Sequence, residues 1–449
     1  MFSKEFLKEV LDIVNMVSGW VWGLPLLILL GGVGLGFTIF LRGLSFRKLI
    51  HALDLAFIKR KEKGAHPGDI THFQALMTSL SATVGTGNIA GVASAIAVGG
   101  PGALFWMWVT GLLGMATKFA EALLAVKFRV LDKNNQMSGG PMYYIEKGLG
   151  MKWLAIAFAV FASIAAFGIG NAVQTNSVAK AMFSAFNIPH WVTGLAFMVG
   201  SALVVLGGIK SIAKVTSVIV PFMILFYVGT ALIIVVLSLD KIPGILSDVF
   251  HYAFTPHAAV GGAVGTLLSK TIQTGVARGI FSNESGLGSS PIAAAAAKTD
   301  EPVHQALVSM TQTFIDTIIV CTLTGLVILS AGEWMNGVKG SELTANSFQA
   351  ILPYGNYAVA ISLVFFAFST ILGWCYYGEK SVEYLFGEKV IHPYRLLFIA
   401  FTGIGAIGSL DIIWGISDIF NGLMAFPNLI ALILLGPVVI KEANRYFKK

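Results

Sequence analysis

Charged side chains are scarce in this sequence. Asp, Glu, Lys and Arg make up 12% of its 449 residues, whereas hydrophobic residues make up 56%. A soluble domain needs more polar side chains than this to cover its surface. The scarcity of charge therefore excludes an ordinary soluble protein and indicates a chain that lies within a lipid bilayer.

Cysteine is rare as well. Cys321 and Cys375 both lie in apolar segments, which is typical of buried small side chains and not of a disulfide or a metal site. The eight histidines lie in loops or at the ends of apolar segments, and none forms an HExxH pair. Because the sequence offers no nucleophile paired with a base, we do not expect an enzyme. The first 20 residues are amphipathic and lack a small-residue cleavage site, so no signal peptide is expected.

Long apolar segments are abundant. A helix needs about 20 apolar residues to cross the hydrocarbon core of a bilayer. Segments of this kind lie at 20–41, 70–97, 102–126, 153–182, 191–208, 215–238, 258–281, 303–330, 356–378, 394–410 and 416–440. No polar stretch between them is long enough for a soluble domain. The sequence therefore predicts an all-α polytopic membrane protein with about 11 transmembrane helices, in which residues 1–449 form a single membrane domain.

Lys and Arg gather in alternate connections between these segments. If the amino terminus is outside, the cytoplasmic connections contain 22 of the 30 Lys and Arg residues and the outer connections contain 4. Because cytoplasmic loops are enriched in these residues, we expect the amino terminus outside and the carboxyl terminus in the cytoplasm of a multi-pass cell-membrane protein. The formal net charge of +7 then reflects loops that face anionic lipid, and no nucleic-acid partner is expected.

The first cytoplasmic loop is predicted to contain a helix. Its apolar residues fall at helical spacing, with basic residues among or just beyond them: Phe46, Leu49, Ile50, Leu53 and Phe57. An amphipathic helix of this kind lies in the inner membrane interface or packs on the protein, and the sequence leaves both readings open.

The span 70–97 has an unusual centre. Residues 79–91 read SLSATVGTGNIAG, and so much glycine and hydroxyl disfavours a continuous helix. Unwound backbone at membrane depth is tolerated only where it lines a cavity or is buried in protein. Its carbonyls can ligate a hard cation, and the new helix amino terminus suits a carboxylate. The alternative is helix packing, since Gly87 and Gly91 form a small-xxx-small pair.

A second span carries the same kind of interruption. Residues 269–288 read SKTIQTGVARGIFSNESGLG, with two cations at membrane depth. The interrupted spans are the second and the seventh, and each begins a set of five that runs in the opposite direction to the other. Paired interrupted helices in two inverted halves indicate a transporter's binding site. We expect repeats at 70–238 and 253–440, a peripheral amino-terminal helix and an amphipathic helix within 1–69, and a cytoplasmic tail at 441–449.

Several motifs carry a resemblance to a known family. They are TVGTGNIAG at 83–91, GGPGA at 99–103, FWMW at 105–108 and RGIFSNESGLG at 278–288. In these the sequence resembles the alanine or glycine:cation symporter family, over essentially the whole chain. The resemblance implies a secondary amino-acid transporter with the five-plus-five inverted-repeat fold of the leucine transporter. It also implies an extra first helix at the periphery, a monomer, and alanine or glycine as substrate.

The resemblance assigns roles to residues of the first interrupted span. The N–H groups of Thr86 and Gly87 would hold the substrate carboxylate. A sodium ion would bind a set of backbone carbonyls and side-chain hydroxyls from two spans: Ser81, Val84, Phe366, Ser369 and Thr370. Sodium is a hard cation that takes oxygen ligands, which suits this set. A Ser/Thr pair alone would indicate only hydroxyls bonded to their own helix.

A second sodium site is implied less fully. Asn88 matches one of its ligands, and the other candidates are Thr83, Thr271, Gln312 and Asp316. Asp316 is the one acid near the middle of its span, so it is a candidate functional residue. The alternative is an ion pair with Lys270 or Arg278.

The remaining site candidates concern the substrate. Gln174 would bond the substrate or brace the unwound segment, and interhelical bonding is the alternative. Trp374 follows Thr370 by four positions on the same helix face, so it would fill much of the cavity and admit only a small side chain. The alternative is a tryptophan at the lipid interface. The second interrupted span would contribute Ile272, Gln273, Thr274 and Gly275, and 282–290 resembles a gate.

The sequence as a whole favours sodium-coupled uptake of alanine or glycine by alternating access. A proton-coupled carrier of the same fold, with Asp316 or Glu284 titrating, is the main alternative. A channel is a further alternative, but it would not require a repeat of interrupted helices.

The orientation can be tested with an impermeant thiol reagent added outside right-side-out vesicles. The reagent should label Ser3→Cys and leave Lys448→Cys unlabelled, because the Lys and Arg bias is 22 to 4. Labelling of Lys448→Cys alone would show that the topology is the reverse of the predicted one.

Overall fold

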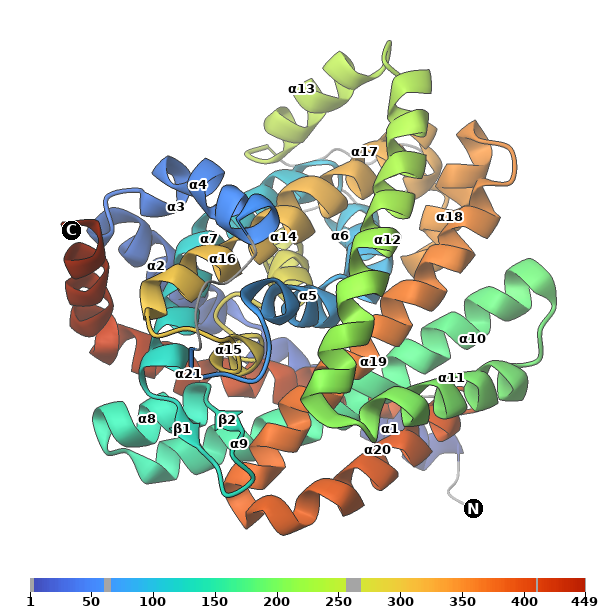
Figure 1. Cartoon of the computed structure of the whole chain (residues 1–449). Helices are drawn as coiled ribbons and strands as arrows, with labels where there is room; N and C mark the ends of the chain where they lie inside the picture. The colour runs from blue at the N-terminus through green and yellow to red at the C-terminus, as the bar shows by residue number, and fades with distance from the viewer. Residues whose placement is uncertain (1–3, 60–65, 256–267, 409–410, 449) are drawn as a thin grey trace.

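The computed structural model describes residues 4–59, 66–255, 268–408 and 411–448, and it is helical almost throughout (Figure 1). Within these ranges a short antiparallel ladder pairs β1 (Val130–Leu131) with β2 (Met137–Ser138). The prediction of an all-α architecture is confirmed, apart from this ladder.

The first half of the chain contains helices that follow the predicted spans. They are α1 (Lys4–Val21), α2 (Leu24–Phe40), α3 (Leu44–Arg47), α4 (Leu49–Leu53), η1 (Asp54–Ile58), α5 (His72–Thr83), η2 (Gly87–Gly91), α6 (Val92–Gly99), α7 (Gly102–Lys127), α8 (Pro141–Leu149), α9 (Lys152–Phe167), η3 (Gly168–Ala172), α10 (Val173–Phe186), α11 (His190–Val205) and α12 (Gly208–Leu237). The helix predicted in the first loop is present as α3, α4 and η1.

The second half continues in the same way. Its helices are α13 (Ile242–Tyr252), α14 (Leu268–Asn283), α15 (Pro291–Ala295), α16 (Pro302–Thr313), η4 (Phe314–Cys321), α17 (Thr322–Ala331), η5 (Glu333–Met335), α18 (Gly340–Ile351), α19 (Gly355–Phe386), η6 (Glu388–Val390), α20 (Ile391–Gly405) and α21 (Asp411–Phe447). The segments η2, η3 and η4 are π-helical turns within longer helices, and such turns are frequent at functional sites.

Among the described residues, seven helices are long and apolar enough to cross a membrane, or eight if the bent pair α5 and η2–α6 is one span. The other three predicted spans correspond to helices that are too short, within the described residues, to count as crossing a membrane. Helices α11 and α20 have 16 and 15 residues, and the predicted start of 258–281 lies outside the described residues. The count of about 11 and the inverted repeat therefore stay predictions.

The predicted interruption of span 70–97 is confirmed. Helix α5 and the helix over Gly87–Gly99 meet at an angle of 50°. The second interruption lies later than the centre of its predicted span, because α14 runs unbroken to Asn283 and α15 starts at Pro291. In Figure 1 the two interrupted helices, α5–α6 in blue and α14–α15 in yellow, lie together near the middle of the molecule, and α14 packs on α6 and α15 on α5.

The amino-terminal region packs on the rest of the bundle, and its peripheral place stays a prediction. Helix α1 packs along α21, and α2 packs along α7 and α21. The Ser18 hydroxyl donates to the Asp418 carboxylate at 2.7 Å, and the Trp22 indole donates to the Asp418 carbonyl. These bonds anchor α1 to the start of α21, and α1 thereby reaches a functional surface described below.

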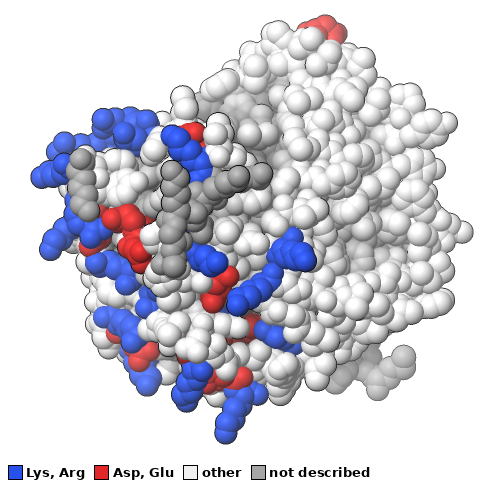
Figure 2. Space-filling model, in the orientation of Figure 1, with Lys and Arg blue, Asp and Glu red and all other residues white. Residues whose placement is uncertain are grey.

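Lys and Arg gather on one side of the molecule, over α2–α4, the end of α21 and the loop between β1 and β2 (Figure 2). At this basic end the chain segments that enter α5 and leave α15 are joined by backbone hydrogen bonds. The N–H groups of Asp69 and Ile70 donate to the carbonyl of Ala296, and the N–H of Lys298 donates to the carbonyl of Ile70 at 2.8 Å. The joined segments close the basic end beneath the two interruptions.

One arginine reinforces this closure. The Arg129 guanidinium donates to four backbone carbonyls, those of Pro67, Ala295, Ala297 and Thr299, over 2.5–2.9 Å. Five N–H donors in a fixed fork allow one arginine to bridge several carbonyls. Burial lowers the pKa of Arg129, and neighbouring carboxylates oppose that shift. Arg129 therefore ties the start of α5 to the end of α15.

Candidate functional site

The first interruption is a short stretch of unwound backbone. Helix α5 ends at Thr83, and Val84 has extended backbone angles. The Asn88 amide oxygen accepts a hydrogen bond from the Gly85 N–H at 2.9 Å, which stabilises the turn. Thr86 and Gly87 stand at the amino terminus of the next helical segment, where N–H groups have no partner in the turn before them. This is the arrangement that suits a carboxylate.

Oxygen atoms from α5 and α19 converge beside this interruption. The Ser369 hydroxyl lies 2.9 Å from the Phe366 carbonyl and 3.4 Å from the Ser81 carbonyl, and the Thr370 hydroxyl lies 2.8 Å from the Phe366 carbonyl. All four residues are buried. Val84 follows α5 directly at the same place. The structure thus brings Ser81, Phe366, Ser369 and Thr370 of the predicted sodium ligands to one buried place. Both hydroxyls donate to the Phe366 carbonyl of their own helix, and the contact from Ser369 to Ser81 links this pair to the first interruption.

Gly85 lies close to α19. A methyl group added at Gly85 would stand 2.6 Å from the Thr370 hydroxyl and 3.6 Å from the Gln174 amide oxygen. The Gln174 amide nitrogen donates to the carbonyl of Ile169 at 3.0 Å. Among the described residues, the Gln174 amide oxygen and the Thr86 hydroxyl are buried without a hydrogen-bond partner. Two unpaired polar atoms therefore flank the interruption.

Trp374 is buried, with 1% of its surface exposed, which excludes a place at the lipid interface. Its ring stands at 65° to that of Tyr377, with ring centroids 5.7 Å apart. On its other side Gly170 lies so close that an added methyl group would stand 2.2 Å from the Trp374 Cβ. Trp374 therefore fills space beside η3.

The second interruption spans residues 284–290. Glu284, Gly286 and Gly288 have positive φ angles of 55°, 92° and 83°, which breaks the helix. One carboxylate oxygen of Glu121, on α7, accepts from the N–H groups of Gly286 and Gly288, both at 3.1 Å. The same oxygen accepts from the Asn428 amide at 2.6 Å. The loop is thus held by groups from α7 and α21.

A buried lysine completes this support. Lys118 donates to the Glu284 carbonyl at 2.9 Å and to the Ser290 hydroxyl at 2.6 Å, and its Nζ lies 3.4 Å from the Glu121 carboxylate. Lys118 and Glu121 thus support the second interruption from α7. The contribution of Asn428 was not predicted, since an asparagine in span 416–440 gives no sign of its distant partner.

Asp316 lies in the π-helical turn η4, beside the first interruption. Its carboxylate accepts from the Asn88 amide at 2.7 Å, the Thr317 hydroxyl at 2.8 Å and the Ser282 hydroxyl at 2.9 Å. Within the described residues it has no Lys or Arg partner, so the alternative of an ion pair with Lys270 or Arg278 is not supported. Asn88 and Asp316 are brought together, as a cation site at this place would require.

Other predicted residues lie elsewhere. The Thr83 hydroxyl bonds the carbonyl of Ser79 in its own helix, and the Thr271 hydroxyl bonds the Gly99 carbonyl at 2.8 Å. Ile272, Gln273, Thr274 and Gly275 lie in unbroken helix, about 15 Å of helix ahead of the second interruption. A methyl group at Gly275 would stand 2.5 Å from the Ala103 carbonyl. This glycine serves close packing of α14 on α7, and the structure does not bring the four residues to the site.

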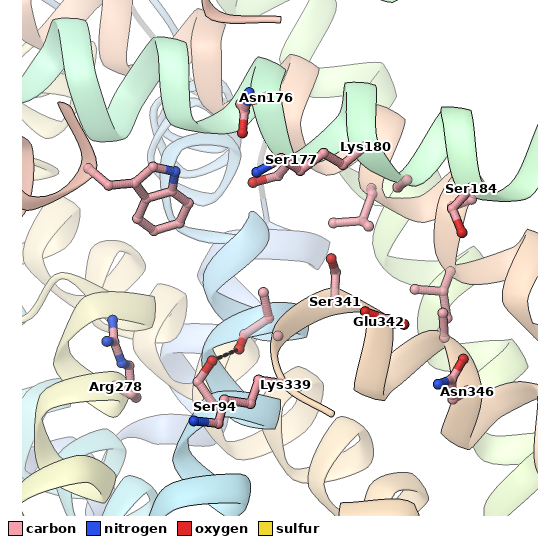
Figure 3. Close-up of a pocket in the computed structure, with 18 of the residues that line it drawn as sticks. Ser94, Asn176, Ser177, Lys180, Ser184, Arg278, Lys339, Ser341, Glu342 and Asn346 are labelled. Atoms are coloured by element: carbon pink, nitrogen blue, oxygen red, sulfur yellow. Dashed lines mark hydrogen bonds between the residues drawn. The ribbon is translucent and has the colours of Figure 1, made fainter. Parts of the chain in front are cut away.

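A polar vestibule of about 860 Å³ opens on the side away from the basic end. Figure 3 shows side chains from α6, α10, α14 and α18 facing one another across it, among them Ser94, Lys180, Arg278 and Glu342. Ser18 of α1 also lines it. The same cavity is lined by Ala90, which lies shortly after the first interruption, and by Leu363, which lies shortly before Phe366. The vestibule thus leads towards the candidate site.

The sequence matches the sodium:alanine symporter family over residues 7–449. This chain belongs to that family. Its members are transporters, so the protein is a transporter and not an enzyme.

Individual relatives share most of the chain. An uncharacterized transporter of Haemophilus influenzae is 54% identical over 442 residues, covering 98% of this chain and 96% of that protein. The sodium/alanine symporter AgcS of Methanococcus maripaludis is 52% identical over 446 residues, covering 98% and 97%. A probable sodium/glutamine symporter of Bacillus subtilis, GlnT, is 36% identical over 449 residues, covering 99% and 92%.

The fold is also found in more distant transporters. The structure of MhsT in complex with L-phenylalanine has a TM-score of 0.59 at 13% identity, covering 84% of this chain and 98% of that one. A manganese transporter of Eremococcus coleocola has a TM-score of 0.52 at 14% identity, covering 84% and 81%. This confirms the leucine-transporter type of fold that the family resemblance implied.

The close approach at Gly85 can be tested with a matched pair of glycines in this member of the family. Gly85→Ala should weaken alanine binding in the presence of sodium by about fivefold or more, because overpacking of this kind costs about 1–3 kcal/mol. An added methyl group at Gly91 would meet nothing within 4 Å, so Gly91→Ala should bind like the wild type. An equal loss of alanine binding in both variants would show that a change in the helix, and not the contact with Thr370, weakens binding.

Proposed function

We propose that this protein carries alanine, or another small neutral amino acid such as glycine, into the cell together with sodium by alternating access. Membership of the sodium:alanine symporter family supports this proposal, as does the 52% identity to a protein named as a sodium/alanine symporter. The observation that carries it is the convergence of the Ser369 and Thr370 hydroxyls with the Phe366 and Ser81 carbonyls beside the first interruption.

In the proposed site the sodium ion binds those oxygen atoms together with the Val84 carbonyl. The substrate carboxylate binds the N–H groups of Thr86 and Gly87, next to the ion, so that each charge stabilises the other. The unpaired amide oxygen of Gln174 then offers an acceptor for the substrate ammonium group. Substrate and ion would each complete the site of the other, which is a physical basis for coupled transport.

A second cation site is proposed at Asn88 and Asp316. A buried carboxylate held only by neutral donors carries an uncompensated charge, and a bound cation would balance it. Among the described residues, no hydrogen bond joins the Thr83 or Thr271 hydroxyl to Asn88 or Asp316, so the proposed site does not use them. Alternatively, a proton bound to Asp316 would neutralise the carboxylate. Replacing sodium by choline separates the two, because a proton-coupled carrier would retain uptake.

The proposed arrangement in the membrane follows the charge pattern. The basic end closed by Arg129 would face the cytoplasm, and the vestibule would face outside, as expected for a carrier that has not yet bound its substrate. Residues 1–449 would form one transport domain, with the two five-helix sets at 70–238 and 253–440. We propose a monomer as the transporting unit.

The sodium site can be tested with a double variant. Ser369→Ala with Thr370→Ala removes two ligands, so sodium-dependent binding of labelled alanine should be lost. The chain offers a matched control in α19, because the buried Ser362 and Ser381 hydroxyls bond only carbonyls of their own helix. Ser362→Ala with Ser381→Ala should keep the wild-type sodium dependence. An unchanged sodium dependence in the first variant would remove this site from the proposal.

Substrate size can be tested at Trp374. Trp374→Ala should admit larger amino acids, because each methylene buried in the new space gains about 0.8 kcal/mol. In competition with labelled alanine, leucine should improve by at least about tenfold relative to the wild type. Alanine itself should bind more weakly, since its methyl group loses packing partners.

In the Trp374→Phe variant, leucine should compete better than in the wild type and less well than in Trp374→Ala. Trp153→Ala serves as a control, since that tryptophan is 66% exposed. If leucine competes equally in all variants, Trp374 does not set the size of the pocket.

A further inference from the structure

A small groove lies at the basic end of the molecule, where α2 and α3 meet the end of α21. It has a volume of about 270 Å³. Arg42, Arg47 and Lys48 line it from one side, and Asn444 and Phe447 line it from α21. In Figure 1 this is the left edge of the molecule, where the carboxyl-terminal helix reaches α3. Among the described residues, no carboxylate lines the groove.

The three cations of the groove are uncompensated. Among the described residues, none of Arg42, Arg47 and Lys48 forms an ion pair, although Lys48 lies 5.2 Å from the centre of the Phe447 ring. Nearby basic residues differ, since Lys127 pairs with Glu442 at 2.7 Å and Arg445 pairs with Glu301 at 2.6 Å. Three like charges around one small groove repel one another unless an anion lies between them.

The groove lies at the edge of the apolar surface. Phe40, at the end of α2, is 67% exposed, and Ile50, in α4, is 84% exposed. Exposed apolar side chains on either side of a basic groove mark the level where hydrocarbon meets lipid head groups. A ligand in this groove would therefore present a phosphate to the cations and acyl chains to the apolar surface beside them.

We propose that the groove binds the head group of an anionic phospholipid from the cytoplasmic leaflet. Arg42, Arg47 and Lys48 contact the phosphodiester, and Asn444 offers further hydrogen bonding. Basic pockets between transmembrane helices on the cytoplasmic side have the chemistry for such head groups. The site is separate from the transport site, and its occupation would join α2 to the carboxyl-terminal end of α21, which also packs against the rest of the bundle.

The test is native mass spectrometry of the full-length protein with phosphatidylglycerol or phosphatidylcholine. The groove variant combines Arg42→Gly, Arg47→Gln and Lys48→Gln. Arg42 has a φ of 55°, a conformation that glycine adopts without strain, so this change should not impair folding. The control variant combines Lys133→Gln, Lys147→Gln and Lys389→Gln, three exposed lysines outside the groove. It removes the same total charge.

The wild type should retain a tightly bound phosphatidylglycerol, and the groove variant should bind it about 100-fold more weakly, at about one decade or less per cation. The control should stay within about threefold of the wild type, since exposed charges contribute little each. Phosphatidylglycerol should also raise the Tm of the wild type and the control, but not that of the groove variant.

Three results would overturn the proposal. Equal loss in the groove and control variants would show attraction by overall charge alone. Equal retention of phosphatidylcholine would show that the anionic head group is not recognised. Saturation of the groove by millimolar glycerol phosphate, with displacement of the lipid, would identify a site for a free phosphate ester.

Discussion

Backbone groups that leave a helix inside a bilayer must find partners within the protein, because the hydrocarbon offers none. This constraint shapes the centre of the structure. At the second interruption the Glu121 carboxylate accepts hydrogen bonds from the N–H groups of Gly286 and Gly288, and Lys118 donates to the Glu284 carbonyl. At the first interruption the Asn88 side chain accepts a hydrogen bond from the Gly85 N–H. Buried polar residues on neighbouring helices thus make the unwound segments stable.

The charges that meet this need also set the electrostatics of the site. Lys118 and Glu121 lie 3.4 Å apart and neutralise each other. Two other buried carboxylates have only neutral hydrogen-bond donors among the described residues. They are Asp316, beside Asn88 at the first interruption, and Glu284, beside Ser289 at the second. A cation near either carboxylate would balance its charge.

The same two interruptions connect the site with both ends of the molecule. The vestibule reaches the half of the first interrupted helix that follows the break, at Ala90, and the Arg129 bonds tie together the chain beside the basic ends of both interrupted helices. Opening of the basic end requires these bonds to break, since four carbonyls share one guanidinium. The four bonds are close together and solvent can replace them, which keeps such a closure reversible.

The sequence alone was sufficient for the membrane class and the first interruption, because composition and helical spacing are local properties. The Ser369–Thr370 pair came from the family resemblance, and its role as a sodium site stays a prediction. The sequence was not sufficient for the second interruption. Gly275 and Gly279 suggested a break, but an added methyl group at either would collide with α7, at 2.5 Å from the Ala103 carbonyl and 2.2 Å from the Thr110 hydroxyl. These glycines permit close packing. The break lies at 284–290, where Glu121 receives the freed N–H groups from 165 residues away. Only the tertiary structure decides this, because a glycine that breaks a helix and one that packs it differ in their distant neighbours and not in their own sequence.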